Sequence, residues 1–332
     1  MDAEAVRFEG VCKAFGTNVI YDGLDLTVRK GEVLTILGGS GSGKSVMLKM
    51  MLGLLPWDAG RVVVLGQDIT GCDDARLLPV RRRLGMVFQN SALFDSLTVF
   101  ENLAYPLLER GIDEGPTLQR RIADVLDMVD LKGTEDVMPA DLSGGMRKRV
   151  GLARAVVQSP EILLYDEPTT GLDPINVRRI DELILGLRKQ LGLTSIVVTH
   201  DLASAYLVSD RLAMLAQRRI VEIAETTRFR ASSVPEVRAF LDAMDTGRQG
   251  SDAGSSVHHA QENHACEGRS VRGSRAGGAD RHRIRDRPGT LDVHVEDAPV
   301  HQFHGHQRAG RGGAGPPRRS GRGSRQGDRL RR

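Results

Sequence analysis

The sequence predicts an α/β domain with a mostly parallel sheet, followed by a C-terminal segment of a different kind. Short apolar runs alternate with amphipathic helical stretches over residues 1–245, a glycine-rich loop follows one of those runs, and the charge balance changes near residue 246. Strands that alternate with helices favour parallel pairing, because each helix supplies the crossover that a parallel connection needs.

Composition excludes several classes of protein. Of the 332 residues, 40% are hydrophobic and 27% are charged, which is ordinary for a globular chain. No run approaches the roughly eighteen consecutive apolar residues of a membrane span, and no signal peptide opens the sequence. Cys12, Cys72 and Cys266 lie far apart, which suggests neither a disulfide framework nor a zinc site. We therefore expect a cytoplasmic protein that reaches a membrane only through a partner.

Six short apolar runs are the strand candidates. Several are apolar at successive positions, as expected where helices cover both faces of a sheet. The first of them is β-branched and ends directly in glycines. The runs are Val33–Leu37, Arg61–Leu65, Gly85–Phe88, Glu161–Tyr165, Thr194–Thr199 and Arg211–Leu215.

Helical spacing appears between these runs. Residues 90–160 have a mainly helical pattern and form an insertion between two strands of the sheet, and residues 46–55 form an apolar helix after the glycine-rich loop. Two apolar stripes follow the i, i+3, i+4, i+7 spacing of one helix face. They are Ile122, Val125, Leu126 and Val129, and Ile180, Leu183, Ile184, Leu187 and Leu191.

The segment from Thr246 to Arg332 cannot build a core of its own. It carries 17 Arg, no Lys and 9 acidic residues, a net charge of +8, whereas the preceding 245 residues carry −5. Few aliphatic residues and a single aromatic residue, Phe303, predict a disordered appendage. An out-of-frame reading of a GC-rich gene after about Asp245 is a second interpretation, and phosphate-backbone binding by Arg/Gly tracts is a third. Since charge runs are usually only solvated, no nucleic-acid partner is expected.

The loop after the first apolar run has the pattern G-x-x-x-x-G-K-[ST] of a phosphate cradle. Its residues are Gly38, Gly39, Ser40, Gly41, Ser42, Gly43, Lys44 and Ser45. Glycines let successive N–H groups converge on an anion, and the following helix adds its dipole. Lys44 is expected to reach the outer phosphates of a nucleotide, and the Ser45 hydroxyl to ligate Mg²⁺. Because strand, loop and helix follow in this order, a nucleotide site is favoured over a flexible glycine turn.

Two acids end the apolar run of residues 162–165. The carboxyl ends of parallel strands meet at one edge of the sheet, so Asp166 and Glu167 are expected on the same edge as the phosphate loop. Asp166 is the expected Mg²⁺ partner, directly or through water. Glu167 is placed to accept a proton from an attacking water. Alone, this pair would more often mark a strand entering a solvated turn, but beside the phosphate loop the functional interpretation dominates.

A second glycine-rich string, Leu142-Ser143-Gly144-Gly145-Met146, precedes a helix rich in Arg and Lys. Ser143, Gly144 and Gly145 form another anion site at a helix N-terminus, although one nucleotide in one cradle does not obviously need two. Here the sequence resembles the ATP-binding subunits of ABC transporters, whose signature LSGGQ matches as LSGGM. In that family the signature of one subunit closes over ATP held by the other, so the resemblance implies a head-to-tail dimer with two ATP molecules between the chains.

The resemblance extends over residues 6–245 and implies further roles. Gln89 matches the glutamine that senses Mg²⁺ and the attacking water, and His200 matches the switch histidine that contacts the γ-phosphate. Asp173, in Gly171-Leu172-Asp173, matches the residue that bridges the subunits. Phe15 lies where the family places an aromatic that stacks on adenine, although a Phe in an N-terminal hairpin is equally well explained as core.

The resemblance also implies the domain organisation. A P-loop NTPase core of the RecA-like type spans residues 1–89 and 161–245, with an N-terminal antiparallel β part and a helical subdomain at about 90–160. ATP and Mg²⁺ are the implied cofactors. Segment 89–110 is expected to touch a membrane permease through some of its apolar residues, which are Leu93, Phe94, Leu97, Val99 and Phe100.

Short strings narrow the resemblance. LFDSLTVFEN at 93–102, Tyr105-Pro106-Leu107 and LSGGM look like the ATPases of Mla/MCE-type phospholipid transport systems. This implies an ATPase peripheral to the inner face of the membrane, with a permease, an MCE-domain lipid-binding protein and a small STAS-like regulator as partners. The alternatives are the ATPase of an importer for a small polar solute such as an amino acid, an ABC ATPase with no membrane partner, and a regulatory nucleotide-binding module without turnover.

Overall fold

The computed structural model describes residues 3–112 and 115–252. In the helix that ends this range, side chains are described as far as Met244. All of these residues belong to one compact unit.

A six-stranded sheet forms the centre of the domain, in the order β10-β9-β3-β8-β7-β6. The pairs β9–β3, β3–β8, β8–β7 and β7–β6 are parallel, and only the edge hairpin β9–β10 is antiparallel, which confirms the predicted mostly parallel sheet. The strands are β3 (Val33–Leu37), β6 (Leu84–Val87), β7 (Ile162–Asp166), β8 (Thr194–Val198), β9 (Arg211–Ala216) and β10 (Arg219–Glu225).

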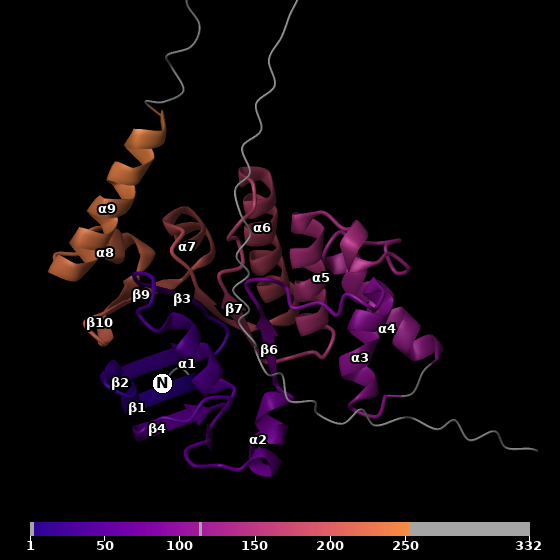
Figure 1. Ribbon diagram of the computed structural model, residues 1–332, viewed down its shortest axis with the longest axis horizontal. Helices are drawn as coiled ribbons and strands as arrows, with labels where there is room; N and C mark the ends of the chain where they lie inside the picture. The colour runs from indigo at the N-terminus through magenta and orange to yellow at the C-terminus, as the bar shows by residue number, and fades with distance from the viewer. Residues whose placement is uncertain (1–2, 113–114, 253–332) are drawn as a thin grey trace, which may run out of the picture. The chain divides into compact units, whose positions relative to one another are not determined.

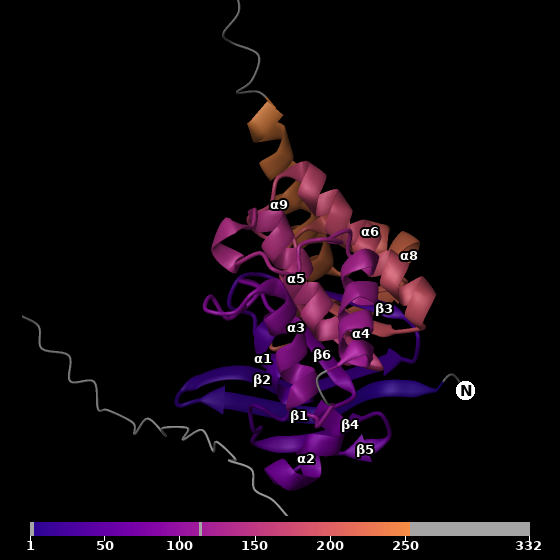
Figure 2. The ribbon, with the colours of Figure 1, turned by 90° about the vertical axis from the view of Figure 1, so that its right-hand side faces the viewer.

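An antiparallel sheet of four strands, in the order β2-β1-β4-β5, makes up the N-terminal part. It contains the run predicted at residues 61–65, so that run lies outside the parallel sheet. Figure 2 shows the two long strands β1 and β2 lying across the lower part of the domain, with α2 beneath them and the other labelled helices above. The strands are β1 (Glu4–Phe15), β2 (Asn18–Arg29), β4 (Ala59–Val64) and β5 (Gln67–Asp68).

The helices α3, α4 and α5 form the insertion between β6 and β7, as the sequence predicted. Figure 1 shows them gathered at one side, away from the antiparallel sheet. The helix after the phosphate loop, α1, begins at Lys44 and ends at Met51, shorter than the predicted 46–55. The helices are α1 (Lys44–Met51), α2 (Asp74–Arg81), α3 (Val99–Leu108), α4 (Pro116–Met128), the 3₁₀ turn η1 (Pro139–Asp141), α5 (Gly144–Val156), α6 (Pro174–Leu191), α7 (Leu202–Val208), α8 (Thr226–Arg230) and α9 (Pro235–Asp252).

One face of the parallel sheet packs in a first core, and the other face packs in a second and a third core. Leu164 packs with the antiparallel sheet and α1, whereas its neighbour Leu163 packs with the helical insertion and α6. Successive side chains of a strand point to opposite faces, so one strand supplies the first and the second core. The predicted stripe at 122–129 is fully part of the second core, while Leu191 at the end of the other stripe is exposed.

The last helix, α9, passes through the boundary predicted at residue 245 and ends at Asp252. Val237 and Leu241 bury its first turns against α7, β9 and α8. Helix propagation adds one hydrogen bond per residue once a nucleus exists, so a few polar residues can continue an anchored helix. The rest of the predicted tail, including Cys266 and Phe303, lies outside the described residues. Among residues 3–112 and 115–252, none of the helices combines the length and the hydropathy that a membrane-spanning segment needs.

Candidate functional site

The phosphate loop lies between the end of β3 and the start of α1. Gly43 adopts φ +105°, and a Cβ there would meet Ile20 Cγ2 at 2.6 Å, so only glycine fits at this position. The Tyr21 hydroxyl donates a 2.6 Å hydrogen bond to the Gly43 carbonyl. The strand β2 therefore holds the loop from outside, through a contact that no local pattern in the sequence signals.

Lys44 is buried at the base of the loop. Its Nζ donates to the carbonyls of Gly38 and Gly39 at 2.9 and 3.0 Å. Burial lowers the pKa of the Lys44 ammonium, and the carboxylates of Glu167 and Asp166 offset part of that shift. An anion bound above the loop would give this cation an additional partner.

The loop has the features that a phosphate group needs. The Ser42 Oγ is buried and has no hydrogen-bond partner among the described residues. A Cβ at Gly39 or Gly41 would meet nothing within 4 Å, so the backbone there is open to a close approach. Phosphate oxygens could accept hydrogen bonds from the Ser42 hydroxyl and from the backbone N–H groups of the loop. The residues therefore fit a nucleotide phosphate.

The predicted magnesium ligands Ser45 and Asp166 are in direct contact. Ser45 Oγ donates to Asp166 Oδ1 at 2.8 Å, across from α1 to the end of β7. Burial raises the pKa of Asp166, and the hydrogen bond from Ser45 opposes the rise. A hydroxyl oxygen and a carboxylate oxygen at this spacing are hard donors of the kind Mg²⁺ takes, so the pair fits the implied ion.

Glu167 and His200 are in direct contact on the far side of the site. His200 Nδ1 lies 2.8 Å from Glu167 Oε2, which also accepts hydrogen bonds from the Thr170 and Thr199 hydroxyls at 3.1 and 3.4 Å. The sequence pattern indicated His200 but neither threonine. Glu167 has φ +49°, a left-handed conformation that is rare and costly for a residue with a Cβ. Such an outlier at a strand end, held from several sides, is typical of a functional position.

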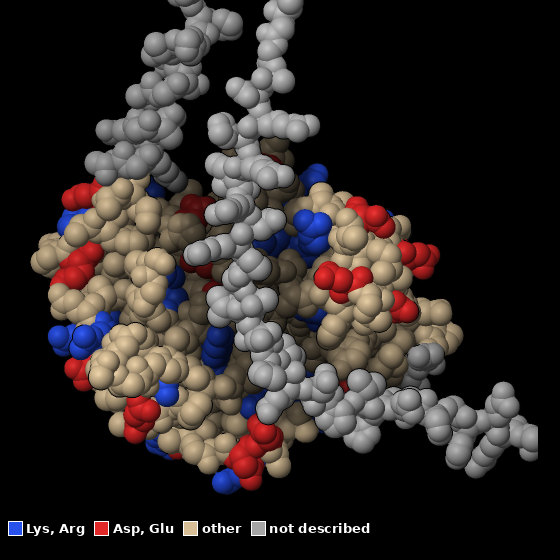
Figure 3. All heavy atoms as spheres, in the orientation of Figure 1, with Lys and Arg blue, Asp and Glu red and all other residues tan. Residues whose placement is uncertain are grey.

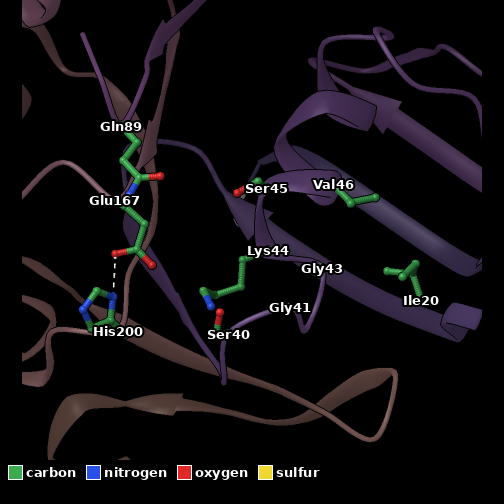
Figure 4. Close-up of a pocket in the computed structure, with 10 residues that line it drawn as sticks. All are labelled: Ile20, Ser40, Gly41, Gly43, Lys44, Ser45, Val46, Gln89, Glu167 and His200. Atoms are coloured by element: carbon green, nitrogen blue, oxygen red, sulfur yellow. Dashed lines mark ion pairs between the residues drawn. The ribbon is translucent and has the colours of Figure 1, made fainter. Parts of the chain in front are cut away.

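One cavity of about 500 Å³ joins these groups. Figure 4 shows Glu167 and His200 on one side of it and Lys44 and Ser45 on the other. The cavity brings together residues that are more than a hundred positions apart in the chain. Its lining residues are Ile20, Ser40, Gly41, Gly43, Lys44, Ser45, Val46, Gln89, Glu167 and His200.

The signature residues lie outside this cavity. Ser143 caps α5 by accepting a 3.2 Å hydrogen bond from the Met146 N–H, and both Ser143 and Gly144 are exposed. Gly145 is buried against α6. A Cβ at this position would lie 2.5 Å from the Asn176 side chain, so the close packing requires glycine. The predicted second anion site is thus an open helix N-terminus whose own chain brings no phosphate loop to it.

Asp173 and Phe15 also lie outside the cavity. Asp173 caps α6 by accepting hydrogen bonds from the Ile175 and Asn176 N–H groups, and its contacts with Asn176 lower the pKa of the Asp173 carboxyl. Phe15 is 47% exposed at the end of β1, with Lys13 Nζ 4.9 Å from the ring centroid. An exposed ring is not a core residue, so the structure leaves Phe15 available for stacking.

Comparison with known proteins identifies the family. The family described as ABC transporter matches residues 21–170. Over 243 residues the chain is 37% identical to the probable ribonucleotide transport ATP-binding protein mkl of Mycobacterium tuberculosis H37Rv, covering 73% of this chain and 68% of that protein. The chain belongs to the ABC transporter ATP-binding family. The phosphate loop and the LSGGM string both lie within the matched range.

Other relatives carry different names. The cassette is 37% identical over 245 residues to the intermembrane phospholipid transport system ATP-binding protein MlaF of Escherichia coli K12, covering 74% of this chain and 91% of that one. It is 35% identical over 308 residues to the methionine import ATP-binding protein MetN of Rhizobium johnstonii, covering 90% and 84%. Among solved structures, the dimeric post-hydrolysis state of the cassette MJ0796 with ADP and Pi superposes with a TM-score of 0.62 at 32% identity, covering 67% of this chain and 98% of that one.

Proposed function

We propose that this cassette hydrolyses Mg-ATP and powers a separate membrane permease that moves phospholipid or a related hydrophobic substrate. The observation that carries the proposal is the single cavity in which Lys44, Ser45 and the Glu167–His200 pair face one another. Binding alone would need the phosphate loop but not a carboxylate held in a left-handed conformation beside a histidine. A regulatory module without turnover is therefore the weaker explanation.

The proposed roles follow from the chemistry of each group. Lys44 and the N–H groups of residues 38–45 hold the β- and γ-phosphates. Ser45, Asp166 and Gln89 hold Mg²⁺, which when bound neutralises charge on the phosphates. Glu167 accepts a proton from the attacking water, and His200 holds the Glu167 carboxylate and reaches the γ-phosphate.

Phosphate release by the purified chain tests this reaction. Wild type is expected to release phosphate from ATP only with Mg²⁺ present. Glu167→Gln should bind ATP normally but turn over about 10²–10⁴ times more slowly, the usual cost of removing a general base. Turnover of the variant above about a tenth of wild type would contradict the assignment of Glu167.

The exposed signature supports a head-to-tail dimer. Ser143, Gly144 and Gly145 head a helix whose N-terminus is open, and the related cassette MJ0796 has a dimeric structure. We infer that these residues close over ATP held by a second copy, and that Asp173 lies at the contact between the chains. ATP would then draw the two copies together, and loss of the γ-phosphate would release them.

A permease contact is supported by an apolar groove along α3. The groove has a volume of about 410 Å³, and apolar residues make up most of its border, together with Glu101 and Gln119. Its lining residues are Leu97, Phe100, Glu101, Ala104, Tyr105, Leu108, Gly115, Leu118 and Gln119. Phe94 and Tyr105 are 44% and 46% exposed and stack as a tilted pair with centroids 5.1 Å apart. Of the apolar residues expected to touch the permease, Val99 is fully buried and belongs to the core instead, because it faces inward from the first turn of α3.

The proposal of a lipid substrate is supported by short sequence strings and by one relative. LFDSLTVFEN and LSGGM look like phospholipid transport ATPases, and MlaF carries that name at 37% identity. MetN is nearly as similar, which keeps import of a small polar solute as the second candidate. In the lipid case the partners would be a permease, an MCE-domain protein and a STAS-like regulator, with the cassette on the inner face of the membrane.

Purification of the complex separates these candidates. A tagged cassette expressed with its neighbouring genes should copurify with a permease and an MCE-domain protein, and turnover in phospholipid nanodiscs should exceed turnover in detergent alone. Copurification with an amino-acid permease, or stimulation by a solute-binding protein, would support the second candidate. No integral membrane partner at all would favour an ABC ATPase that works without one.

A further inference from the structure

A buried lysine on the signature helix faces the ATP site of its own chain. Lys148, on α5, is 8% exposed. Its Nζ donates to the backbone carbonyl of Gln89 and, at 3.4 Å, to the backbone carbonyl of Glu167. Gln89 lies two residues after β6 and Glu167 directly after β7, and both line the cavity. One ammonium therefore joins three segments that are distant in sequence.

Burying the Lys148 ammonium costs free energy, so other interactions must offset that cost. Burial lowers the pKa of its ammonium, while the Glu167 carboxylate opposes that shift. A buried cation is tolerated where it donates hydrogen bonds, and backbone carbonyls accept them without bringing a second charge. The side chain thus replaces water around the carbonyls of two residues of the site.

The Glu167 peptide is the part that most needs support. Its φ of +49° is unfavourable for a residue with a Cβ. The Glu167 N–H donates to the Val198 carbonyl at 2.9 Å, and Lys148 binds the Glu167 carbonyl on the other side of the residue. With both ends of the residue bound, the carboxylate is held toward the cavity.

We propose that Lys148 is a positioning residue that fixes Gln89 and Glu167 in its own chain, while the N-terminus of the same helix acts on the nucleotide of the second copy. The inference rests on the proposed function, because it assigns a role within that ATP site. Helix α5 would then serve two ATP sites, one through Ser143–Gly145 and the other through Lys148.

The neighbouring Arg149 is a matched control. It lies on the same helix, is 6% exposed, and also donates to two backbone carbonyls. Those carbonyls belong to Val129 and Asp130 in the helical insertion, at 3.0 and 2.8 Å, and neither residue lines the cavity. Replacing Arg149 should disturb packing to a similar degree without reaching Gln89 or Glu167.

Steady-state kinetics with three variants tests the proposal. Lys148→Met should lower kcat about 10–100-fold with KM for Mg-ATP changed less than about threefold, the pattern of a misplaced catalytic group. Lys148→Arg should recover most of the lost turnover, since a guanidinium can still donate to both carbonyls. Arg149→Met should lower the melting temperature yet keep kcat near wild type. Near-normal kcat in Lys148→Met, or an equal loss in Arg149→Met, would overturn the proposal.

Mixing two impaired variants shows which ATP site Lys148 serves. In a mixed dimer, one ATP site combines the intact Lys148 and Glu167 of the Ser143→Arg chain with the intact signature of the Lys148→Met chain. Mixing of equal amounts should therefore restore turnover, up to a limit of about a quarter of wild type, which is reached if half of the dimers are mixed and each has one complete site. Glu167→Gln mixed with Ser143→Arg is the reference. Restoration in the reference but not with Lys148→Met would mean that Lys148 acts through the signature, against the proposal.

These outcomes separate this inference from the proposed function. If wild type releases no phosphate, or if Glu167→Gln turns over normally, the proposed function fails first. If those two results hold and Lys148→Met is fully active, only the role of Lys148 is lost. If Lys148→Met does not fold, Lys148→Gln, whose amide can still donate to one carbonyl, should give an intermediate kcat, and wild-type turnover in that variant would overturn the proposal.

Discussion

The phosphate loop and the signature loop are both glycine-rich strings that head a helix, yet their own chain surrounds them very differently. Around the phosphate loop, Lys44 binds two loop carbonyls, Tyr21 binds a third, and Ser45 reaches Asp166. At the signature, Ser143 and Gly144 are exposed, and the side-chain contacts described at the helix start are the Ser143 cap and a 2.6 Å hydrogen bond from Arg147 Nη1 to the Leu142 carbonyl. The first is a nearly complete binding site, and the second is half of one.

In the proposed dimer, this difference divides the function between two copies of one chain. A phosphate site that is closed by its own residues can hold nucleotide in a single chain. An open helix N-terminus contributes only when an anion is brought to it, because its donors and dipole act over a short range. Variants at the two loops should therefore fail in different ways.

The largest contrast is expected from Ser143→Arg. A long cation at the open helix N-terminus should block closure over the second copy's ATP and lower turnover by at least about 10²–10³, the usual loss when an electrostatic site for the transition state is removed. ATP binding to one chain should stay near wild type, because no residue of its phosphate loop is changed. Turnover and equilibrium binding of a fluorescent ATP analogue measure the two effects. Normal turnover would show that the site is not shared.

Lys44→Ala should give the opposite pattern. Removing a charged hydrogen-bond donor from the phosphate loop should weaken ATP binding by about 10–100-fold even in a single chain. The same fluorescent analogue, titrated at protein concentrations too low for dimers, measures this loss. Unchanged affinity would mean that the phosphate loop is not what binds the nucleotide.

The smallest effect concerns stability, at a buried acid behind the site. Asp181 on α6 is 3% exposed, accepts a 2.8 Å hydrogen bond from Ser204, and leaves its Oδ1 without a partner in the described structure. Burial raises the pKa of Asp181 from 3.8 to about 6, so the folded state favours the protonated acid. Protonated Asp181 adds to the free energy of unfolding. This contribution is fully present below pH 3.8 and is lost as the pH rises through about 6.

Asp181→Asn imitates the protonated acid and should stabilise the fold where wild type is ionised. We expect a gain of about 1–3 kcal/mol at pH 7.5, shrinking toward zero near pH 4. Thermal melts across that pH range measure it. A gain that does not change with pH would show that Asp181 does not titrate as described. Turnover should stay near wild type, since Asp181 does not line the ATP cavity.

The parts that could be predicted from the sequence are those whose chemistry is local. The strand Val33–Leu37 has the predicted bounds, and Lys44 and Ser45 lie where a loop between strand and helix must put them. Asp166 and Glu167 share an edge with them because parallel strands end together. The family resemblance supplied His200 and Gln89, which local patterns alone would not distinguish from structural residues.

The parts that could not be predicted depend on contacts between distant segments. Tyr21 reaches Gly43 only because β2 passes beside the loop, and Lys148 reaches Gln89 and Glu167 only because α5 packs on β6. No local sequence pattern around Tyr21 or Lys148 predicts these partners. Val99 was one of five apolar residues of which only some were expected to touch a permease, and the packing of α3 places it in the core. Mixed surface charge, visible as interspersed red and blue over the described part of the face in Figure 3, marks no single binding patch either.

Solution scattering of Glu167→Gln is the most direct test of whether two copies of the chain bind the same ATP molecules between them. The account predicts monomers without nucleotide and a compact dimer with ATP and Mg²⁺, because the variant binds ATP but cannot remove the bridging phosphate. Adding Ser143→Arg to the same chain should return it to monomers. A monomer with saturating ATP in the single variant would contradict the account.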